Sequence, residues 1–224
     1  MTLSELWSAF RLLQSPDAFS DAERTLLERF LREEHRARER RRTDYLMKMS
    51  GIGRPKLLEE FDWTFNPQIP RDKIMEYVKT EFLKKPSCLV LVGAAGVGKS
   101  HLASALCHQA ILTGHQTVFI TLFDFTAKLA KAKSAFNLID YYAKVPLLCL
   151  DEIGYVVPTK DQADAVFQII SKRSEIRTTI VTTNLVPSQW GKIFDSVTAS
   201  AILDRLSMNG RFIICEGRSY RSKK

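Results

Sequence analysis

The chain has no long apolar run, no cysteine-rich stretch and no low-complexity tract. Its 224 residues include 4 cysteines at scattered positions, and three of them fall in apolar, strand-like runs. Buried thiols are ordinary there, so the spacing favours neither a disulfide framework nor a metal site. No run of about 18 apolar residues is present, and polar residues interrupt 1–14, unlike a signal peptide. We therefore expect a cytoplasmic protein with no membrane partner.

The composition is that of a globular protein with an excess of positive charge. Hydrophobic residues make up 45% of the chain and charged residues 26%, which argues against disorder. The formal net charge is +8, with a sequence pI near 9.4. Such a charge favours a polyanionic partner such as nucleic acid, although a requirement for solubility would also explain it.

The first 48 residues show helical periodicity and then a break. Two apolar stripes are apparent: Leu3, Leu6, Trp7, Phe10 and Leu13, then Leu26, Leu27, Phe30 and Leu31. The basic run 32–42 also contains glutamates, so it fits a solvated helix face as well as a DNA or partner contact. Glycines and a proline in 50–55 indicate a linker. We expect an N-terminal helical domain at 1–50 and a second domain at 56–224.

From residue 88 onward, apolar runs alternate with helical patterns. The expected strands are 88–92, 117–122, 145–150, 178–181 and 212–215. Continuous apolar runs are typical of parallel strands that are buried on both faces. The sequence therefore predicts an α/β fold with a mostly parallel sheet flanked by helices.

The motif GAAGVGKS at 93–100 follows the first expected strand and opens a helix, as a P-loop does. Its glycines allow a tight turn that points backbone N–H groups at phosphate oxygens. Lys99 would reach the β- and γ-phosphates of ATP, and the Ser100 hydroxyl would coordinate Mg²⁺. The predicted nucleotide-binding residues are Gly93, Ala94, Ala95, Gly96, Val97, Gly98, Lys99, Ser100 and His101.

Two further strands end in polar residues that suit ATP hydrolysis. The run 147–150 leads into Asp151, a candidate Mg²⁺ ligand, and Glu152, a candidate base for the attacking water. The next strand leads into Asn184, whose amide could contact the γ-phosphate and the water or could merely form a turn. An aromatic segment at 61–65 could pack beside adenine or belong to the core.

Several separated motifs resemble those of AAA+ ATPases of the IstB/DnaC type, a P-loop NTPase group. These motifs, spread over roughly 44–222, are GAAGVGKSHLASAL, LLCLDEIGY, VTTNL followed by SQWGKIF, AILDRL and GRSYR. The tryptophan element and the DEIGY step are more similar to IstB, the helper ATPase of insertion-sequence transposition. DnaC is the helicase loader of DNA replication.

The resemblance implies further roles for individual residues. Asn184 matches the sensor-1 position, Arg205 the arginine finger and Arg221 the sensor-2 arginine. Because an arginine finger acts on a nucleotide bound by a neighbouring subunit, the resemblance implies a homo-oligomer. A surface salt bridge is the alternative for Arg205.

A second basic group follows the second expected strand. The spacing of Lys128 and Lys131 places them on one helix face, with Lys133 displaced around the same helix. In the resembling family this region faces DNA, and contact with phosphates there would be independent of sequence. A solvated helix surface explains each lysine equally well.

Three functions are therefore compatible with the sequence. The favoured one is an ATP-dependent, DNA-binding AAA+ ATPase that assembles on DNA and assists a transposase. The first alternative is a helicase loader whose partner is a replicative helicase. The weakest is a small-molecule P-loop kinase, because Glu152 is placed to activate water and no arginine-rich lid is apparent.

Overall fold

The computed structural model describes residues 2–78 and 83–223. Internal contacts divide the chain into two compact units, Met1–Tyr45 and Leu46–Lys224. The two functional domains expected from the sequence, at 1–50 and 56–224, stay predictions. Helices of the described residues are α1 Leu3–Ala9, η1 Pro16–Ala18, α2 Asp21–Ser50, α3 Arg71–Met75, α4 Lys99–Leu112, α5 Leu122–Lys131, α6 Ala135–Lys144, α7 Lys160–Arg173, η3 Pro187–Lys192, α8 Ser196–Met208 and η4 Tyr220–Lys223.

The first unit has a small apolar core of its own. Leu6 and Trp7 of α1 and Leu31 of α2 are buried in it, and the Trp7 and Phe19 rings lie 5.7 Å apart. Leu3, Phe10 and Leu27 pack against this cluster, as the apolar stripes predicted. This core forms because two amphipathic segments cover each other's apolar side chains.

The stripes are shorter than the sequence suggested. Leu13 lies beyond the end of α1 and is fully exposed. Leu26 and Phe30 of α2 are also exposed, at 59% and 64%. With only seven residues, α1 covers Leu27 and Leu31 but leaves the neighbouring row of α2 side chains open to solvent.

The second unit is built on one five-stranded sheet with the order β2-β3-β4-β1-β5. The strands are β1 Cys88–Val92, β2 Thr117–Thr121, β3 Leu147–Ile153, β4 Thr178–Thr183 and β5 Gly210–Ile214. All four strand pairings are parallel, which confirms the predicted α/β class. β1, β3 and β4 are buried almost throughout, as their continuous apolar sequences predicted.

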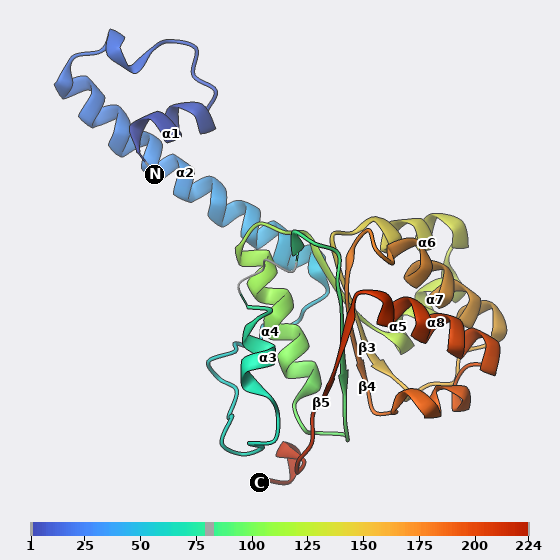
Figure 1. Cartoon of the computed structure of the whole chain (residues 1–224). Coiled ribbons are helices and arrows are strands. Elements are labelled where there is room, and N and C mark those ends of the chain that lie inside the picture. Colours follow the sequence, from blue (N-terminus) through green and yellow to red (C-terminus); the bar gives the residue numbers. More distant parts are fainter. Residues whose placement is uncertain (1, 79–82, 224) are drawn as a thin grey trace. The chain divides into compact units, whose positions relative to one another are not determined.

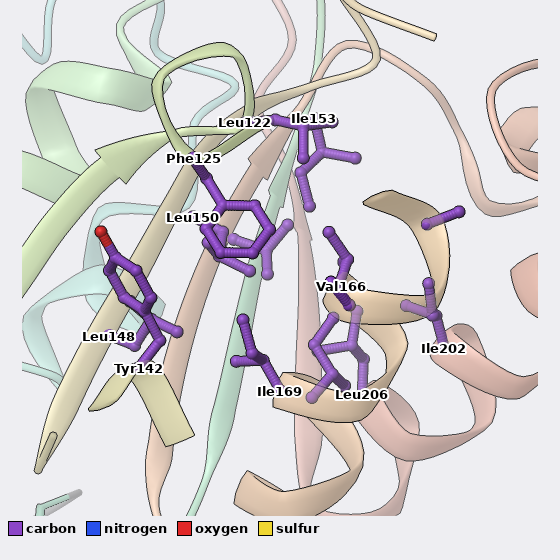
Figure 2. Close-up of a cluster of buried hydrophobic side chains, with 14 of the residues drawn as sticks. Leu122, Phe125, Tyr142, Leu148, Leu150, Ile153, Val166, Ile169, Ile202 and Leu206 are labelled. Carbon is purple, nitrogen blue, oxygen red and sulfur yellow. The ribbon is translucent and has the colours of Figure 1, made fainter. Parts of the chain in front are cut away.

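Helices cover both faces of the sheet (Figure 1). α3 and α4 lie on one face, and α5, α6, α7 and α8 lie on the other. Each face has its own apolar cluster, and Figure 2 shows the one under α5–α8, where Phe125, Leu150, Val166 and Ile202 meet. Because β4 lies between β1 and β3, the carboxyl ends of these three strands are adjacent. Ligands of such sheets bind at this edge.

Across residues 2–78 and 83–223, no helix combines the length and the apolar character that crossing a bilayer would require.

Candidate nucleotide site

The loop between β1 and α4 has backbone conformations that require glycine at two positions. Gly96 has φ 81° and Gly98, the N-cap of α4, has φ 107°. A Cβ atom on Gly96 would lie 2.1 Å from Ser219 Oγ, and one on Gly98 would lie 2.5 Å from the Phe61 ring. The glycines therefore let two other segments approach the loop closely, in addition to allowing its turn.

Lys99 is the first residue of α4, and its side chain is folded back over the loop. The residue is 6% exposed, and its Nζ donates to the carbonyl oxygens of Gly93 and Ala94, both at 2.7 Å. Burial lowers the pKa of Lys99, and the nearby carboxylates of Asp151 and Glu152 oppose that shift. The ammonium group lines a cleft and can reach a bound phosphate.

Ser100 and Asp151 are brought together from positions far apart in the sequence. The Ser100 hydroxyl donates to Asp151 Oδ1 at 2.9 Å, and the Thr182 hydroxyl donates to the same oxygen. A hydroxyl oxygen beside a carboxylate oxygen is the kind of hard oxygen pair that Mg²⁺ binds together with waters and phosphates. These residues therefore fit the ion predicted from the sequence.

A β-bulge places Asp151 and Glu152 at this edge. Leu150 pairs with Val181 and Ile153 pairs with Thr183, so two residues of β3 face the single residue Thr182 of β4. Glu152 has φ 60°, and its N–H donates to the Thr182 hydroxyl at 3.0 Å. Successive side chains of a regular strand point to opposite faces, whereas a bulge re-aims one of them. Here Glu152 lines the same cleft as Lys99 and Ser100.

Asn184 follows β4, the strand between β1 and β3. Its Oδ1 atom is buried and has no hydrogen-bond partner within the described part of the chain. Gly154 leaves room for this atom, since a Cβ there would lie only 2.2 Å from it. A buried amide oxygen without a partner is costly, and Asn184 is not among the described residues that line the cleft of Lys99 and Glu152.

The cleft is open to solvent and has about 940 Å³ of empty space. Phe61 and Phe65 line it. Phe61 and Trp63 both pack against the apolar cluster on the α3–α4 face of the sheet. Packing of this segment beside adenine stays a prediction. The His101 Nε2 atom lies 2.8 Å from the Leu57 carbonyl oxygen, and its ring packs edge-on against Phe61.

The end of the chain returns to the same cleft. The Tyr220 N–H donates to the Gly96 carbonyl oxygen at 2.9 Å, and Tyr220 and Arg221 line the cleft. Asn66 also lines it and is 3% exposed. Sequence reasoning did not single out Asn66, because its partners lie about 150 residues later and leave no local pattern.

Arg205 is not brought to the cleft of its own chain. It lies on α8, forms an ion pair with the adjacent Asp204, and does not line the cleft that Lys99 and Glu152 share. This ion pair agrees with the surface salt bridge that was the alternative for Arg205 in the sequence. A role for Arg205 in the site of a neighbouring subunit would require assembly.

The three lysines predicted to contact DNA are all exposed, but they do not share a helix. Lys128 and Lys131 lie on α5 and border a shallow groove with Gly51 and Phe119. The prediction that Lys133 lies farther round the same helix is wrong, because α5 ends at Lys131. Lys133 lies in the loop before α6, where Ser134 caps the next helix.

The sequence matches the profile of one protein family over its whole length. The family is described as IstB-like ATP binding protein, and the match covers residues 1–224. The ATP-binding protein of insertion sequence IS21 from Pseudomonas aeruginosa is 35% identical over 198 residues, 87% of this chain and 75% of that protein. The corresponding protein of IS5376 from Geobacillus stearothermophilus is 32% identical over 226 residues, 99% of this chain and 89% of that protein.

A solved structure supports the same fold. The crystal structure of DnaI has a TM-score of 0.62 to this chain, with 23% identity, and the alignment covers 75% of this chain and 91% of that one. At this level of identity the likeness concerns the fold alone. It agrees with the AAA+ arrangement expected for the second unit.

Proposed function

Because this chain belongs to the family of IstB-like ATP-binding proteins, we propose that it is a Mg²⁺-dependent ATPase that assembles on DNA and assists a transposase. The observation that carries the ATPase proposal is the hydrogen bond between Ser100 and Asp151, with Lys99 and Glu152 facing one cleft beside it. Nucleotide cradle, metal ligands and candidate base are thus assembled within a single chain.

Each residue has a distinct part in the proposed reaction. Backbone N–H groups of the P-loop and the Lys99 ammonium bind the β- and γ-phosphates, while Ser100 and Asp151 hold the ion. Bound Mg²⁺ would neutralise charge on the phosphates. Glu152 accepts a proton from the water that attacks the γ-phosphate, and the Asn184 amide orients that water.

Arginines complete the proposed site from two directions. Arg221 lies in the cleft of its own chain, where its charge can face the phosphates. Arg205 is partly exposed on α8, with 39% of its side chain accessible. We assign it to the site of a neighbouring copy, so that turnover requires a homo-oligomer.

Two features support the DNA and transposase parts of the proposal. Relatives that are 32–35% identical over most of this chain are ATP-binding proteins of insertion sequences. The chain carries a net charge of +8, and the exposed Lys128 and Lys131 are available for phosphates. Binding through such contacts is independent of sequence and weakens steeply with salt.

The test is phosphate release from ATP with and without duplex DNA, at two salt concentrations. We expect DNA to stimulate release without any added phosphate acceptor, and Glu152→Gln to remove the stimulated activity. Formation of ADP that needs a small-molecule acceptor, with the phosphoryl group on that acceptor and no free phosphate, would instead support a kinase. Turnover that neither duplex nor single-stranded DNA changes would refute the DNA-dependent part.

The assignment of Arg205 has its own test in mixed oligomers. Arg205→Ala and Lys99→Ala should each be inactive, because each lacks one half of the shared site. Mixing them should restore part of the activity, since some interfaces then combine an intact P-loop with an intact arginine. If mixtures stay inactive although both variants assemble, Arg205 does not act between subunits.

The transposase part is tested by binding. The protein, loaded with a non-hydrolysable ATP analogue and DNA, is mixed with the transposase of an IS21-type insertion sequence or with a replicative helicase. Retention of the transposase alone is the expected outcome. Retention of the helicase alone would favour the loader function instead.

A further inference from the structure

Asn66 bonds to the C-terminal tail with both halves of its amide. Its Nδ2 donates to the Arg218 carbonyl oxygen at 2.9 Å, and the Arg218 N–H donates to Asn66 Oδ1 at 2.8 Å. The side chain therefore pairs with one backbone residue in the way that a neighbouring strand would. Asn66 is 3% exposed, so water competes little for these two hydrogen bonds.

The tail is shaped to receive this amide. Gly217 has φ 138°, a region that favours glycine, and a Cβ atom on it would lie 2.2 Å from Asn66 Oδ1. A side chain at residue 217 would therefore push the tail away from Asn66. The two residues form one contact, in which a small residue lets the amide reach the backbone of its neighbour.

Beyond this contact the tail lies against the P-loop. Ser219 is next to Gly96, and the Tyr220 N–H donates to the Gly96 carbonyl oxygen. Arg221 lines the cleft with Lys99. Only two residues separate Arg218 from Arg221.

We propose that Asn66 is a positioning residue for the nucleotide site: it fixes the tail at Arg218 so that the side chain of Arg221 faces the phosphates of bound ATP. The inference rests on the proposed nucleotide site and adds the way in which its C-terminal arginine is held. A flexible tail would place Arg221 in many positions, and the binding free energy would include the cost of ordering it. Because Asn66 orders the tail when the chain folds, the free energy of binding does not include that cost.

The test measures the affinity for a fluorescent ATP analogue with Mg²⁺ in a double-mutant cycle of Asn66→Ala and Arg221→Ala. Each single change should weaken binding by about 10-fold, the scale of one hydrogen bond to a charged group. The double variant should bind like Arg221→Ala alone, because Asn66 acts only through that arginine. If Asn66→Ala weakens binding by the same factor without Arg221, the proposal is wrong.

Two further variants separate positioning from folding. Gly217→Ala disturbs the same contact from the tail side and should match Asn66→Ala, whereas Gly191→Ala is the control, since a Cβ atom there meets nothing within 4 Å. Asn66→Asp keeps the acceptor for the Arg218 N–H but cannot donate to the Arg218 carbonyl, and should also weaken binding. If Asn66→Ala does not fold, a double-mutant cycle of Gly217→Ala and Arg221→Ala tests whether the contact acts through Arg221.

Failure of this inference is distinguishable from failure of the proposed function. Wild-type protein that binds the analogue but releases no phosphate contradicts the proposed ATPase and leaves the role of Asn66 intact. Wild-type and Asn66→Ala proteins that bind the analogue equally well contradict only the role of Asn66.

Discussion

Two buried cations lie at opposite edges of the same sheet, and they are held in different ways. Lys99 lies at the carboxyl edge, where its ammonium group donates to two backbone carbonyls and faces a cleft. Arg173 lies at the amino edge, is 1% exposed, and has its five N–H groups directed at six acceptors.

The surroundings of Arg173 explain how a charge is tolerated there. Its acceptors include the carbonyls of Tyr142 and Ala143 in the last turn of α6, the negative end of that helix. Further bonds reach the Val145 carbonyl and the Thr179 hydroxyl. Burial lowers the pKa of Arg173 to about 9, so the guanidinium group remains charged at neutral pH.

The difference separates a structural cation from a ligand-binding one. Arg173 satisfies carbonyls that end α6 and begin the neighbouring strands, and all of its donors are used within the fold. Lys99 has three donors, and two are used by described residues. A buried charge with spare bonding capacity beside a cleft is the one that a bound anion can stabilise.

Lys99→Ala should produce the largest functional change and leave the fold intact. Loss of the ammonium group removes charge-assisted hydrogen bonds to the phosphates, so ATP binding and turnover should fall below detection. The melting temperature of the nucleotide-free protein should fall little, because the removed group was itself costly to bury. Titration calorimetry measures ATP binding, and thermal unfolding measures the stability of the nucleotide-free variant. A variant that does not fold would show that Lys99 is a structural cation like Arg173.

Glu152→Gln should separate binding from chemistry at the same edge. Glutamine keeps the shape and the backbone bond to Thr182 but cannot accept the proton of the attacking water. We expect turnover to fall by about 10²- to 10⁴-fold, the usual contribution of a positioned base, with ATP affinity nearly unchanged. Single-turnover hydrolysis measures the rate of the chemical step, and equilibrium binding measures the ATP affinity. Normal turnover would show that another group activates the water.

Arg173→Met should reverse the pattern seen with Lys99→Ala. Methionine fills part of the space but leaves buried carbonyls without donors, which should cost about 3–5 kcal/mol of the free energy of unfolding. Below its melting temperature the variant should still bind ATP, because Arg173 lies at the far edge of the sheet from the P-loop. Denaturant unfolding gives the stability, and Lys172→Met, an exposed neighbour, is the matched control. A change below about 0.5 kcal/mol, the size expected for an ordinary surface substitution, would mean that the bond network does not hold this edge.

The contrast between the two cations also marks what the sequence could predict. Lys99 belongs to a local motif between a strand and a helix, so its position followed from eight consecutive residues. Arg173 is one of several basic residues near the end of α7, and nothing in its neighbourhood shows that it is buried. Its acceptors come from segments about 30 residues earlier and from β4, and only the tertiary fold brings them together.

The same limit applies within the nucleotide site. The strands and the acidic pair were predictable, because buried parallel strands are continuous apolar runs that end in polar residues. The bulge at Glu152 was not, since it depends on how β3 pairs with β4. The prediction for Lys133 failed for a local reason, because a helix end at Lys131 interrupts the spacing rule.

Two buried thiols allow a finer comparison, because one lies near each cation. Burial raises the pKa of Cys88, near Arg173, and of Cys215, near Lys99, to about 11 in both cases, and the cations oppose the shift. At pH 8 both thiols are therefore almost fully protonated and should react slowly with iodoacetamide. The Cys215 carbonyl lies against Gly93 of the P-loop, whereas Cys88 begins β1 at the other edge.

Nucleotide binding should consequently protect one thiol and not the other. A ligand that stabilises the carboxyl edge reduces local opening there, so a Mg²⁺–ATP analogue should slow alkylation of Cys215 by a few-fold, about the factor expected from a modest local stabilisation. Alkylation of Cys88 should not change, because the amino edge is held by Arg173 in the presence or absence of nucleotide. Timed alkylation followed by mass spectrometry resolves the two peptides. Equal protection of both would mean that the sheet opens as one unit and that the two edges are not independent.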